Sequence, residues 1–380
     1  MVRVLQLALL SVLFILPYPS SKATEGWKPA NTHAVIIGVT RWQADLTRYS
    51  RRHRKDRELR DLLVQRGVPV ENISMLLDSQ ATLANIRQAI NSHLLKTTSE
   101  STLLIYYAGH GWKMGDDFCF ANYDVRLGRD SQNTAWTISE LANRVDQSFH
   151  GRQAIFLGDC CHSGGMRLIV EKLQARNVPS FSLTSATTAN TSTGNWTFTQ
   201  CIIDALTGLP LMDRDRDGMI TLGELRTEVA EAMLHLEGQS SGFLSGGIDD
   251  GFVIGETNGA VIDVPNLRFP LGSYVRVRGR YGRVVGIKGD STEPYVVEFY
   301  NYTEKQVKKY SEADLRASLR STNRRTSAME PDCEVEWRGR WYPAKVLREA
   351  NGQWYIHYID DDDSWDEWVG RERIRFGNDK

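Results

Sequence analysis

The chain has 380 residues, of which 41% are hydrophobic and 24% charged, the balance of an ordinary globular protein. This length predicts two or three domains. The formal net charge of −1 excludes a global attraction to nucleic acid or to an anionic membrane, so any charge-based function must be local.

The first residues have the pattern of a secretory signal peptide. Arg3 supplies a positive charge, an apolar run extends from Leu5 to Leu16, and the small residues Ser21 and Ala23 suit a cleavage site. The run is shorter than the ~20 residues that a bilayer-spanning helix needs. We therefore predict a signal peptide at residues 1–23 and a secreted or periplasmic protein. The alternative is an uncleaved anchor or a chain with a different start.

From His33 onward, apolar strand-like runs alternate with amphipathic helix-like segments. Strands are predicted at His33–Val39, Ile73–Leu77, Ser101–Tyr107, Ala154–Gly158, Phe181–Ala186 and, as a closing strand, Phe252–Ile254. Helices are predicted at Asp56–Arg66, Leu83–Leu95, Ile138–Val145 and Phe198–Leu206. This alternation predicts an α/β domain at residues 24–257, with a mostly parallel sheet flanked by helices. Sites in such sheets form at the carboxyl ends of the strands.

Two residues at predicted strand ends form a candidate nucleophile and base. His110 follows one strand, and Cys161 follows another, 51 residues later. A thiol of ordinary pKa is mostly protonated at neutral pH, and a nearby imidazole lets it react as the thiolate. The backbone amides of Gly111 and Cys161 are the expected donors to a developing oxyanion. The alternative is a buried structural thiol and a core histidine.

The neighbouring cysteine is assigned a different role. Strand side chains alternate, so Asp159 and Cys161 should point to one side and Cys160 to the other, as a small buried hydrophobe. His162 is a poor base because its position directs it away from its neighbour.

The chain has five cysteines, which are Cys119, Cys160, Cys161, Cys201 and Cys333. Five are few for a disulfide scaffold, and because the number is odd, at least one thiol should stay free.

These segments resemble a known family. The motif "YYAGHG" around His110 and the motif "DCCHSGG" around Cys161 are similar to the His and Cys motifs of metacaspases and bacterial caspase-like peptidases. The resemblance also includes "HAVIIGV" and "TFTQCIIDAL" and covers roughly Thr32 to Glu256. It implies a caspase-like fold and a cysteine endopeptidase. The family places its nucleophile directly before His-Ser-Gly, which again selects Cys161.

The resemblance also implies a substrate preference. In the metacaspase pattern an aspartate two residues before the nucleophile and another at the start of the first helix form an acidic S1 pocket; these positions match Asp159 and Asp56. Two carboxylates suit a guanidinium, so cleavage after Arg or Lys is implied. The alternative is that Asp56 stabilises the N-terminus of a helix through the helix dipole, and that Asp159 is a structural acid at a strand end. Ala108 departs from the pattern, because many metacaspases carry Ser there.

A second motif predicts a calcium site. Residues 213–224 fit an EF-hand loop at every ligand position, with Gly218 at the sharp turn. The implied ligands are Asp213, Asp215, Asp217, Met219 through its carbonyl, Thr221 and Glu224. No second loop pairs with this one, so a single Ca²⁺ site of modest affinity is expected. The alternative is an acidic turn without metal.

Beyond residue 266 the pattern changes to short β-runs with glycine turns. Residues 267–318 resemble a small SH3-like barrel, and residues 331–378 resemble a Tudor-knot or chromo-barrel module. Five tryptophans fall in the second module: Trp337, Trp341, Trp354, Trp365 and Trp368. They could form a cage for a cation or a groove for a peptide, or they pack the core of a small barrel. The ligand is unknown, and the predicted signal peptide argues against nucleic acid.

The sequence therefore predicts an endopeptidase that cleaves protein or peptide substrates after basic P1 residues. We expect its activity to depend on calcium and its accessory modules to tether it. One rival is a catalytically silent scaffold that acts through its modules; the intact Cys161 and His110 argue against it. A second rival makes the modules the main function, with the peptidase only maturing the chain.

Overall fold

The computed structural model describes residues 26–50, 54–190, 192, 194–259, 268–277, 280–288, 292–300, 305–317, 332–337, 340–350, 352–358 and 367–376. The predicted signal peptide lies outside the described residues, as do Trp365 and most of the two predicted linkers.

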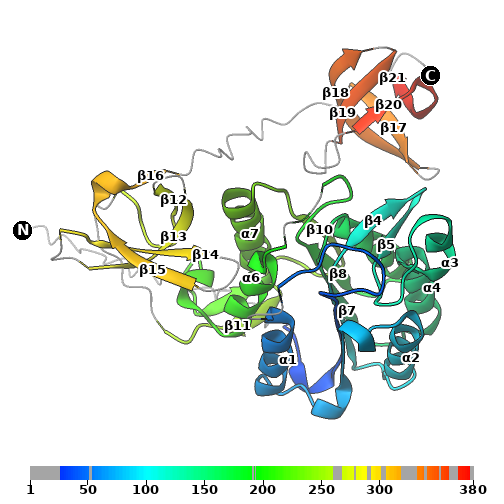
Figure 1. Ribbon diagram of the computed structural model, residues 1–380, viewed down its shortest axis with the longest axis horizontal. Coiled ribbons are helices and arrows are strands. Elements are labelled where there is room, and N and C mark those ends of the chain that lie inside the picture. The colour runs from blue at the N-terminus through cyan, green and yellow to red at the C-terminus, as the bar shows by residue number, and fades with distance from the viewer. Residues whose placement is uncertain are drawn as a thin grey trace, which may run out of the picture.

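A six-stranded sheet is the centre of the first domain (Figure 1), with the order β10-β8-β7-β3-β1-β2. Its strands are β1 (Thr32–Gly38), β2 (Ile73–Leu77), β3 (Thr102–Ala108), β7 (Gln153–Asp159), β8 (Ser180–Thr184) and β10 (Gly242–Gly246). All neighbours pair in parallel except β10, which runs antiparallel to β8. Strands β1, β3 and β7 are buried along their whole length, which explains their continuous apolar sequence.

Helices cover both faces of this sheet. They are α1 (Lys55–Gln65), α2 (Leu83–Leu94), α4 (Ile138–Ser148), α5 (Arg167–Ala175), α6 (Thr197–Leu206) and α7 (Leu222–Ala232); the short helix α3 (Ser131–Thr134) contributes no buried residue. Alternate residues of the central strands divide the core in two: one half packs against α2, α4 and α5, and the other against α1, α6 and α7. The predicted three-layer α/β architecture is confirmed.

Most predicted elements form within one or two residues of their expected bounds, and β2 matches exactly the range Ile73–Leu77. The predicted strand at Phe252–Ile254 does form, as β11 (Val253–Glu256). It does not pair with the large sheet, however, but with β9 (Met219–Thr221). The edge strand next to β8 is β10, which the sequence pattern did not reveal. A small sheet of β4 (Gly111–Met114), β5 (Asp117–Phe120) and β6 (Trp136–Thr137) was also not predicted.

Two small antiparallel sheets follow, each of five strands. The first contains β12 (Tyr274–Val277), β13 (Arg280–Ile287), β14 (Tyr295–Tyr300), β15 (Lys305–Tyr310) and β16 (Arg316–Ala317). The second contains β17 (Cys333–Trp337), β18 (Arg340–Ala350), β19 (Gln353–Tyr358), β20 (Glu367–Val369) and β21 (Ile374–Phe376). In the second sheet Trp341 and Trp368 are partly exposed, and the Arg375 guanidinium lies 4.2 Å from the centre of the Trp341 ring.

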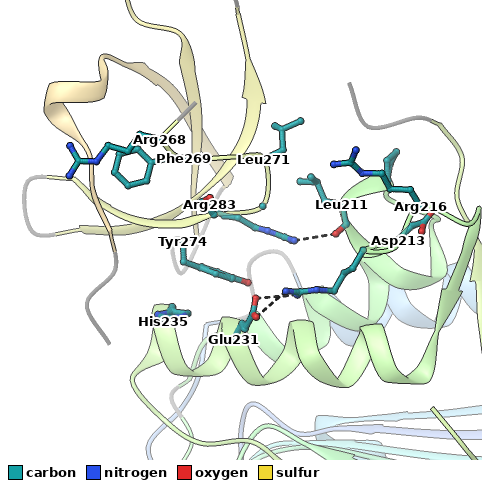
Figure 2. Close-up of a pocket in the computed structure, with 14 residues that line it drawn as sticks. Leu211, Asp213, Arg216, Glu231, His235, Arg268, Phe269, Leu271, Tyr274 and Arg283 are labelled. Carbon is teal, nitrogen blue, oxygen red and sulfur yellow. Dashed lines mark hydrogen bonds and ion pairs between the residues drawn. The ribbon is translucent and has the colours of Figure 1, made fainter. Parts of the chain in front are cut away.

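The first small sheet docks on helix α7 of the large domain through buried charge. Arg283 of β13 forms an ion pair with Glu228 at 2.7 Å, and each side chain is only 3% exposed. The Tyr274 hydroxyl donates a hydrogen bond to the same carboxylate at 2.7 Å. Figure 2 shows Arg283 reaching the carbonyl of Leu211, and the Tyr274 ring stacks on His235. A groove of about 560 Å³ lies between the two units here.

No helix in the described part of the chain combines the length and the apolar character required to cross a membrane.

We predict that Arg283→Ala lowers the free energy of unfolding by about 3 kcal/mol, because it removes the closer and more buried of the two cations that pair with the Glu228 carboxylate; the other, Arg214, lies 3.7 Å away. Urea denaturation followed by tryptophan fluorescence measures this change. The double variant Arg283→Met, Glu228→Leu should recover more than half of the loss, since neither charge remains. The matched control is Arg226→Ala, which breaks the exposed ion pair with Asp250 and should cost less than about 1 kcal/mol. Equal losses in Arg283→Ala and Arg226→Ala would contradict the prediction.

Candidate active site

The register of the parallel sheet brings the candidate catalytic residues to one edge. Ala108 at the end of β3 pairs with Asp159 at the end of β7. His110 and Cys161 each follow two residues later, so they leave neighbouring strands at the same level. Gly111 then begins β4 and packs against the carbonyl oxygen of Cys161 and the Sγ of Cys160. The site therefore lies at the carboxyl edge, where parallel sheets place their ligands.

The Cys161 thiol is half-buried and lies against the loop that contains Ser192. The backbone N–H of Ser192 donates a hydrogen bond to the Cys161 Sγ at 3.1 Å, and the thiol points to the Ser192 carbonyl at 3.6 Å. Burial raises the pKa of the Cys161 thiol, although the bond from Ser192 opposes this shift. In this arrangement the thiol is protonated at neutral pH, so it needs a base.

Cys160 has a different environment, as strand alternation predicts. Its side chain is buried in the core between the sheet and helices α2, α4 and α5. Burial also raises the pKa of its thiol, well above the usual value. All five cysteines are free thiols. Cys161 is thus the more accessible and the less strongly desolvated of the two neighbours.

His110 is fixed by contacts with both ring nitrogens. Its Nε2 lies 2.8 Å from the carbonyl oxygen of Thr47, and its Nδ1 lies 2.7 Å from the hydroxyl of Tyr49. A carbonyl only accepts hydrogen bonds, so Nε2 carries the proton and Nδ1 is the free base that accepts from Tyr49. Burial lowers the pKa of His110, which keeps the imidazole neutral. The imidazole is able to accept a proton, but Tyr49 rather than Cys161 holds the accepting nitrogen.

A small cavity opens beside this pair. Its lining includes Thr40, Tyr49, Ala108, Asp159 and Trp196. Asp159 is buried, and its carboxylate accepts a hydrogen bond from the Thr199 hydroxyl at 2.6 Å. Burial raises the pKa of Asp159 to about 7, and the hydrogen bond from Thr199 limits the rise. The carboxylate is therefore ionised at pH 8 and largely protonated at pH 6.

Asp56 lies apart from the cavity lining. It is the second residue of α1 and is fully buried, and its carboxylate forms an ion pair with Arg54 at 2.5 Å. The Arg54 Nε contacts both carboxylate oxygens at 3.0 and 3.1 Å. The structure thus brings Asp159, but not Asp56, to the cavity wall. His162 is also occupied elsewhere, because its Nδ1 lies 2.6 Å from the carbonyl oxygen of Thr188.

Comparison with known families agrees with this geometry. The model of the caspase domain matches residues 31–245, more than half of the 380 residues. The chain belongs to the caspase family. A Tudor-knot model, described as the RNA binding activity-knot of a chromodomain, matches residues 330–376, so the caspase domain is accompanied by a C-terminal Tudor-knot domain.

The caspase domain is distantly homologous to plant metacaspases. Metacaspase-4 of Arabidopsis thaliana is 29% identical over 126 residues, which cover 29% of this chain and 28% of that protein. Metacaspase-7 of the same plant is 30% identical over 115 residues, which cover 26% of this chain and 27% of that protein. The matched segments thus span little more than a quarter of these relatives.

Solved caspase structures are also similar to this chain. The initiator caspase Dronc of Drosophila has 10% sequence identity and a TM-score of 0.39, over 64% of this chain and 91% of its own. Caspase-1 from Spodoptera frugiperda has 14% identity and a TM-score of 0.40, over 67% of this chain and 100% of its own.

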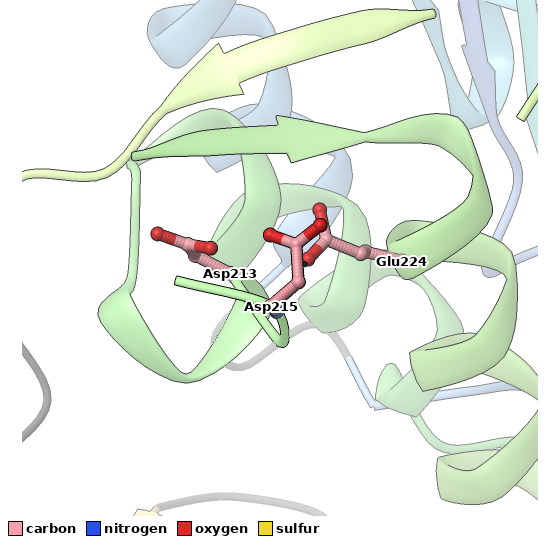
Figure 3. A group of neighbouring side chains, drawn as sticks. All are labelled: Asp213, Asp215 and Glu224. Carbon is pink, nitrogen blue, oxygen red and sulfur yellow. Dashed lines mark hydrogen bonds between the residues drawn. The ribbon is translucent and has the colours of Figure 1, made fainter. Parts of the chain in front are cut away.

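The acidic loop of the caspase domain brings three of its predicted metal ligands together (Figure 3). Oxygen atoms of Asp213, Asp215 and Glu224 lie within 4.8 Å of one another. Asp213 is buried, and its Oδ1 has no hydrogen-bond partner, while its Oδ2 accepts from the Gly218 N–H at 3.0 Å. Gly218 has φ +92°, a left-handed conformation that favours glycine. The turn predicted at this position is confirmed.

The other predicted ligands of the loop have contacts of their own. The Asp217 carboxylate accepts a hydrogen bond from the Met219 N–H at 2.8 Å. Thr221 and Glu224 form a capping box at the start of α7. The second Glu224 oxygen accepts from the Arg214 N–H at 2.5 Å. Glu224 is therefore already oriented toward the loop by the helix that it caps.

Sequence patterns did not reveal several residues of the site. Thr47 acts through its backbone carbonyl, which leaves no side-chain signature. Tyr49 and Ser192 lie in loops without a motif, and they reach His110 and Cys161 only through the folding of distant segments. The side chain of Arg54 could have drawn attention, because a basic residue directly precedes the predicted acidic helix start.

We predict that Tyr49→Phe accelerates alkylation of Cys161 by iodoacetamide near neutral pH. Loss of the hydroxyl frees the Nδ1 of His110 to take the thiol proton. Mass spectrometry of the labelled peptide, sampled over time, measures the rate. The buried thiol of Cys160 should label far more slowly in the same protein. Tyr123→Phe removes a hydroxyl elsewhere and serves as the control. An unchanged or slower rate in Tyr49→Phe would show that Tyr49 does not compete for His110.

Proposed function

We propose that this caspase-family protein is a cysteine endopeptidase in which Cys161 is the nucleophile and His110 is the base. The observation that carries the proposal is the state of His110. Its Nε2–H donates to the Thr47 carbonyl, which leaves Nδ1 as a proton acceptor. His110 follows the end of β3, and Cys161 follows the end of the neighbouring strand β7. Among the five cysteines, Cys161 alone is not buried.

The proposed reaction begins when the Tyr49 hydroxyl leaves the His110 Nδ1. The Cys161 thiol gives its proton to that nitrogen, and the thiolate attacks the substrate carbonyl carbon to form a C–S bond. The amides of Gly111 and Cys161 are the proposed donors to the resulting oxyanion. His110 then protonates the leaving amine as the C–N bond breaks. In the second half, His110 removes a proton from water, which attacks the thioester and releases Cys161.

We further propose that the P1 side chain is basic. Asp159 lines the cavity beside the catalytic pair, and an ionised carboxylate there favours Arg or Lys and repels Asp. Because the pKa of Asp159 is about 7, this selectivity should be present above that pH and decrease as the pH falls through it.

We expect the purified protein to cleave peptides with Arg or Lys at P1 far better than peptides with Asp. The ratio of kcat/KM for Arg over norleucine should be higher at pH 8 than at pH 6; the ratio cancels the titration of Cys161 and His110. Cys161→Ala should abolish hydrolysis, whereas the matched variant Cys160→Ala should retain most of it. Equal loss in both variants, or a library in which Asp substrates are preferred, would refute the proposal.

We also propose that the loop 213–224 binds one Ca²⁺ ion. The support is the unpartnered, buried Oδ1 of Asp213 beside two further carboxylates, because a buried unpaired oxygen is costly without a ligand. Side chains of Asp213, Asp215, Asp217 and Glu224 would hold the ion, with the Met219 carbonyl and Thr221 completing the set. Bound calcium would replace the repulsion among these acids with attraction and so order the loop that leads into α7.

Calcium should raise both the melting temperature and the hydrolysis rate of the protein, and a chelator should reverse both. Asp213→Asn and Glu224→Gln should blunt these responses. The control Asp250→Asn changes a neighbouring acid outside the loop and should preserve them. If neither property responds to calcium, the loop is not a calcium site; if both variants respond fully, the ion binds elsewhere.

A further inference from the structure

Arg54 is a buried guanidinium whose donors are all directed at the edge of the sheet near the cavity. Its side chain is 3% exposed. It bonds to Asp56 through Nε and Nη2, to Asp78 through Nη1 at 2.8 Å, and to the Gly38 carbonyl through Nη2 at 2.8 Å. Its bonds to the two aspartates raise its pKa in spite of burial, so the charge is permanent.

The register of the sheet places this guanidinium in line with the P1 cavity. Gly38, Ala108 and Asp159 are partners across β1, β3 and β7, so the three positions share one face at one level. A Cβ on Gly38 would collide with the Asp56 carboxylate and the Arg54 guanidinium, which shows that the pair lies directly over that position. Ala108 lines the cavity between this pair and Asp159.

Thr40 connects the two regions. It lines the cavity, and it also accepts a hydrogen bond from the Arg54 Nη1 at 3.3 Å and donates to Asp78 at 3.0 Å. The Arg54 cluster therefore lies directly behind one wall of the cavity, and Asp159 forms the other wall. In this arrangement one internal cation occupies the position that a substrate guanidinium would need in order to contact Asp56.

We propose that Arg54 determines P1 specificity by occupying Asp56, so that a basic P1 side chain is recognised by Asp159 alone. This inference rests on the proposed peptidase function. It differs from the two-carboxylate pocket that the metacaspase resemblance implies, because here the first carboxylate is neutralised from within the chain. Asp56 is fully buried, and besides Arg54 it accepts a bond from the N–H of Arg57, so it offers no open oxygen to a substrate.

The test compares isosteric variants of the two acids. Asp159→Asn should reduce the kcat/KM ratio for Arg over norleucine at P1 by about tenfold or more, the scale of one close charge pair. Asp56→Asn should change it by less than about threefold, because Arg54 shields that carboxylate from the substrate. Asp61→Asn alters an exposed acid on the same helix and serves as the matched control. Equal losses for Asp56→Asn and Asp159→Asn would overturn the proposal.

Removing the internal cation provides the converse test. Arg54→Gln frees Asp56, so the Arg over norleucine ratio should rise above that of the wild type. Adding Asp56→Asn to Arg54→Gln should then cancel this gain, whereas Asp56→Asn alone has little effect. Purely additive effects in this double-mutant cycle would overturn the proposal. If Arg54→Gln does not fold, the comparison of Asp56→Asn with Asp159→Asn still decides the question.

A binding readout separates this inference from the peptidase proposal. Agmatine carries the guanidinium of an arginine side chain, and its binding to the Cys161→Ala protein is followed as a shift in melting temperature. Protection should be lost on adding Asp159→Asn and kept on adding Asp56→Asn. If the wild type cleaves no peptide, the peptidase proposal fails, but this pattern still supports the role of Arg54. Absence of protection in all variants, or equal loss for both acids, would overturn it.

Discussion

The pairing of Ala108 with Asp159 across β3 and β7 is the constraint on which the active site depends. The pairing of β3 with β7 ends here, with a hydrogen bond from the Gly109 N–H to the Asp159 carbonyl, and the two segments that follow leave the sheet side by side. His110 and Cys161 follow at equal distances from that point, and the cavity forms where their loops diverge. A slip of one residue would exchange the side chains that pack in the two halves of the core, which are formed with different helices. The geometry of the candidate active site is therefore set by the same contacts that hold the core.

Four buried acids in the large domain are satisfied in two different ways. Asp56 is paired with Arg54, and Glu228 with Arg283, so these carboxylates have their cations within the chain. Within the described residues, Asp159 and Asp213 instead receive hydrogen bonds from a hydroxyl and an amide, without an ion pair. A buried carboxylate without a cation is costly unless it is protonated or binds one from outside. On the functions proposed above, Asp159 would bind the basic substrate side chain and Asp213 would bind calcium.

Sequence patterns were sufficient for the architecture of the large domain and for the separation of the two neighbouring cysteines. Continuous apolar runs identified the buried strands, and alternation at Asp159, Cys160 and Cys161 correctly separated the buried thiol from the accessible one. The edge strand β10 was not found because its sequence, Gly-Phe-Leu-Ser-Gly, has little β-propensity and gains its structure by pairing with β8.

The contacts of the site itself required the structure. Tyr49 reaches His110 across 61 positions of sequence, and Ser192 reaches Cys161 across 31. A local sequence pattern does not encode contacts between residues so far apart in the chain. The resemblance to metacaspases correctly located Asp56 at the start of α1, yet it gave no indication that Arg54, two residues earlier, occupies that carboxylate.

The most direct test of the central claim is to react the protein with a peptidyl-arginine chloromethyl ketone and to locate the adduct by mass spectrometry. The ketone must be bound by the P1 cavity and attacked by the activated thiol, so binding and catalysis are read together. We predict a single adduct on Cys161 in the wild type and its loss in His110→Ala. An adduct on Cys160, or an undiminished adduct on Cys161 in His110→Ala, would contradict the account.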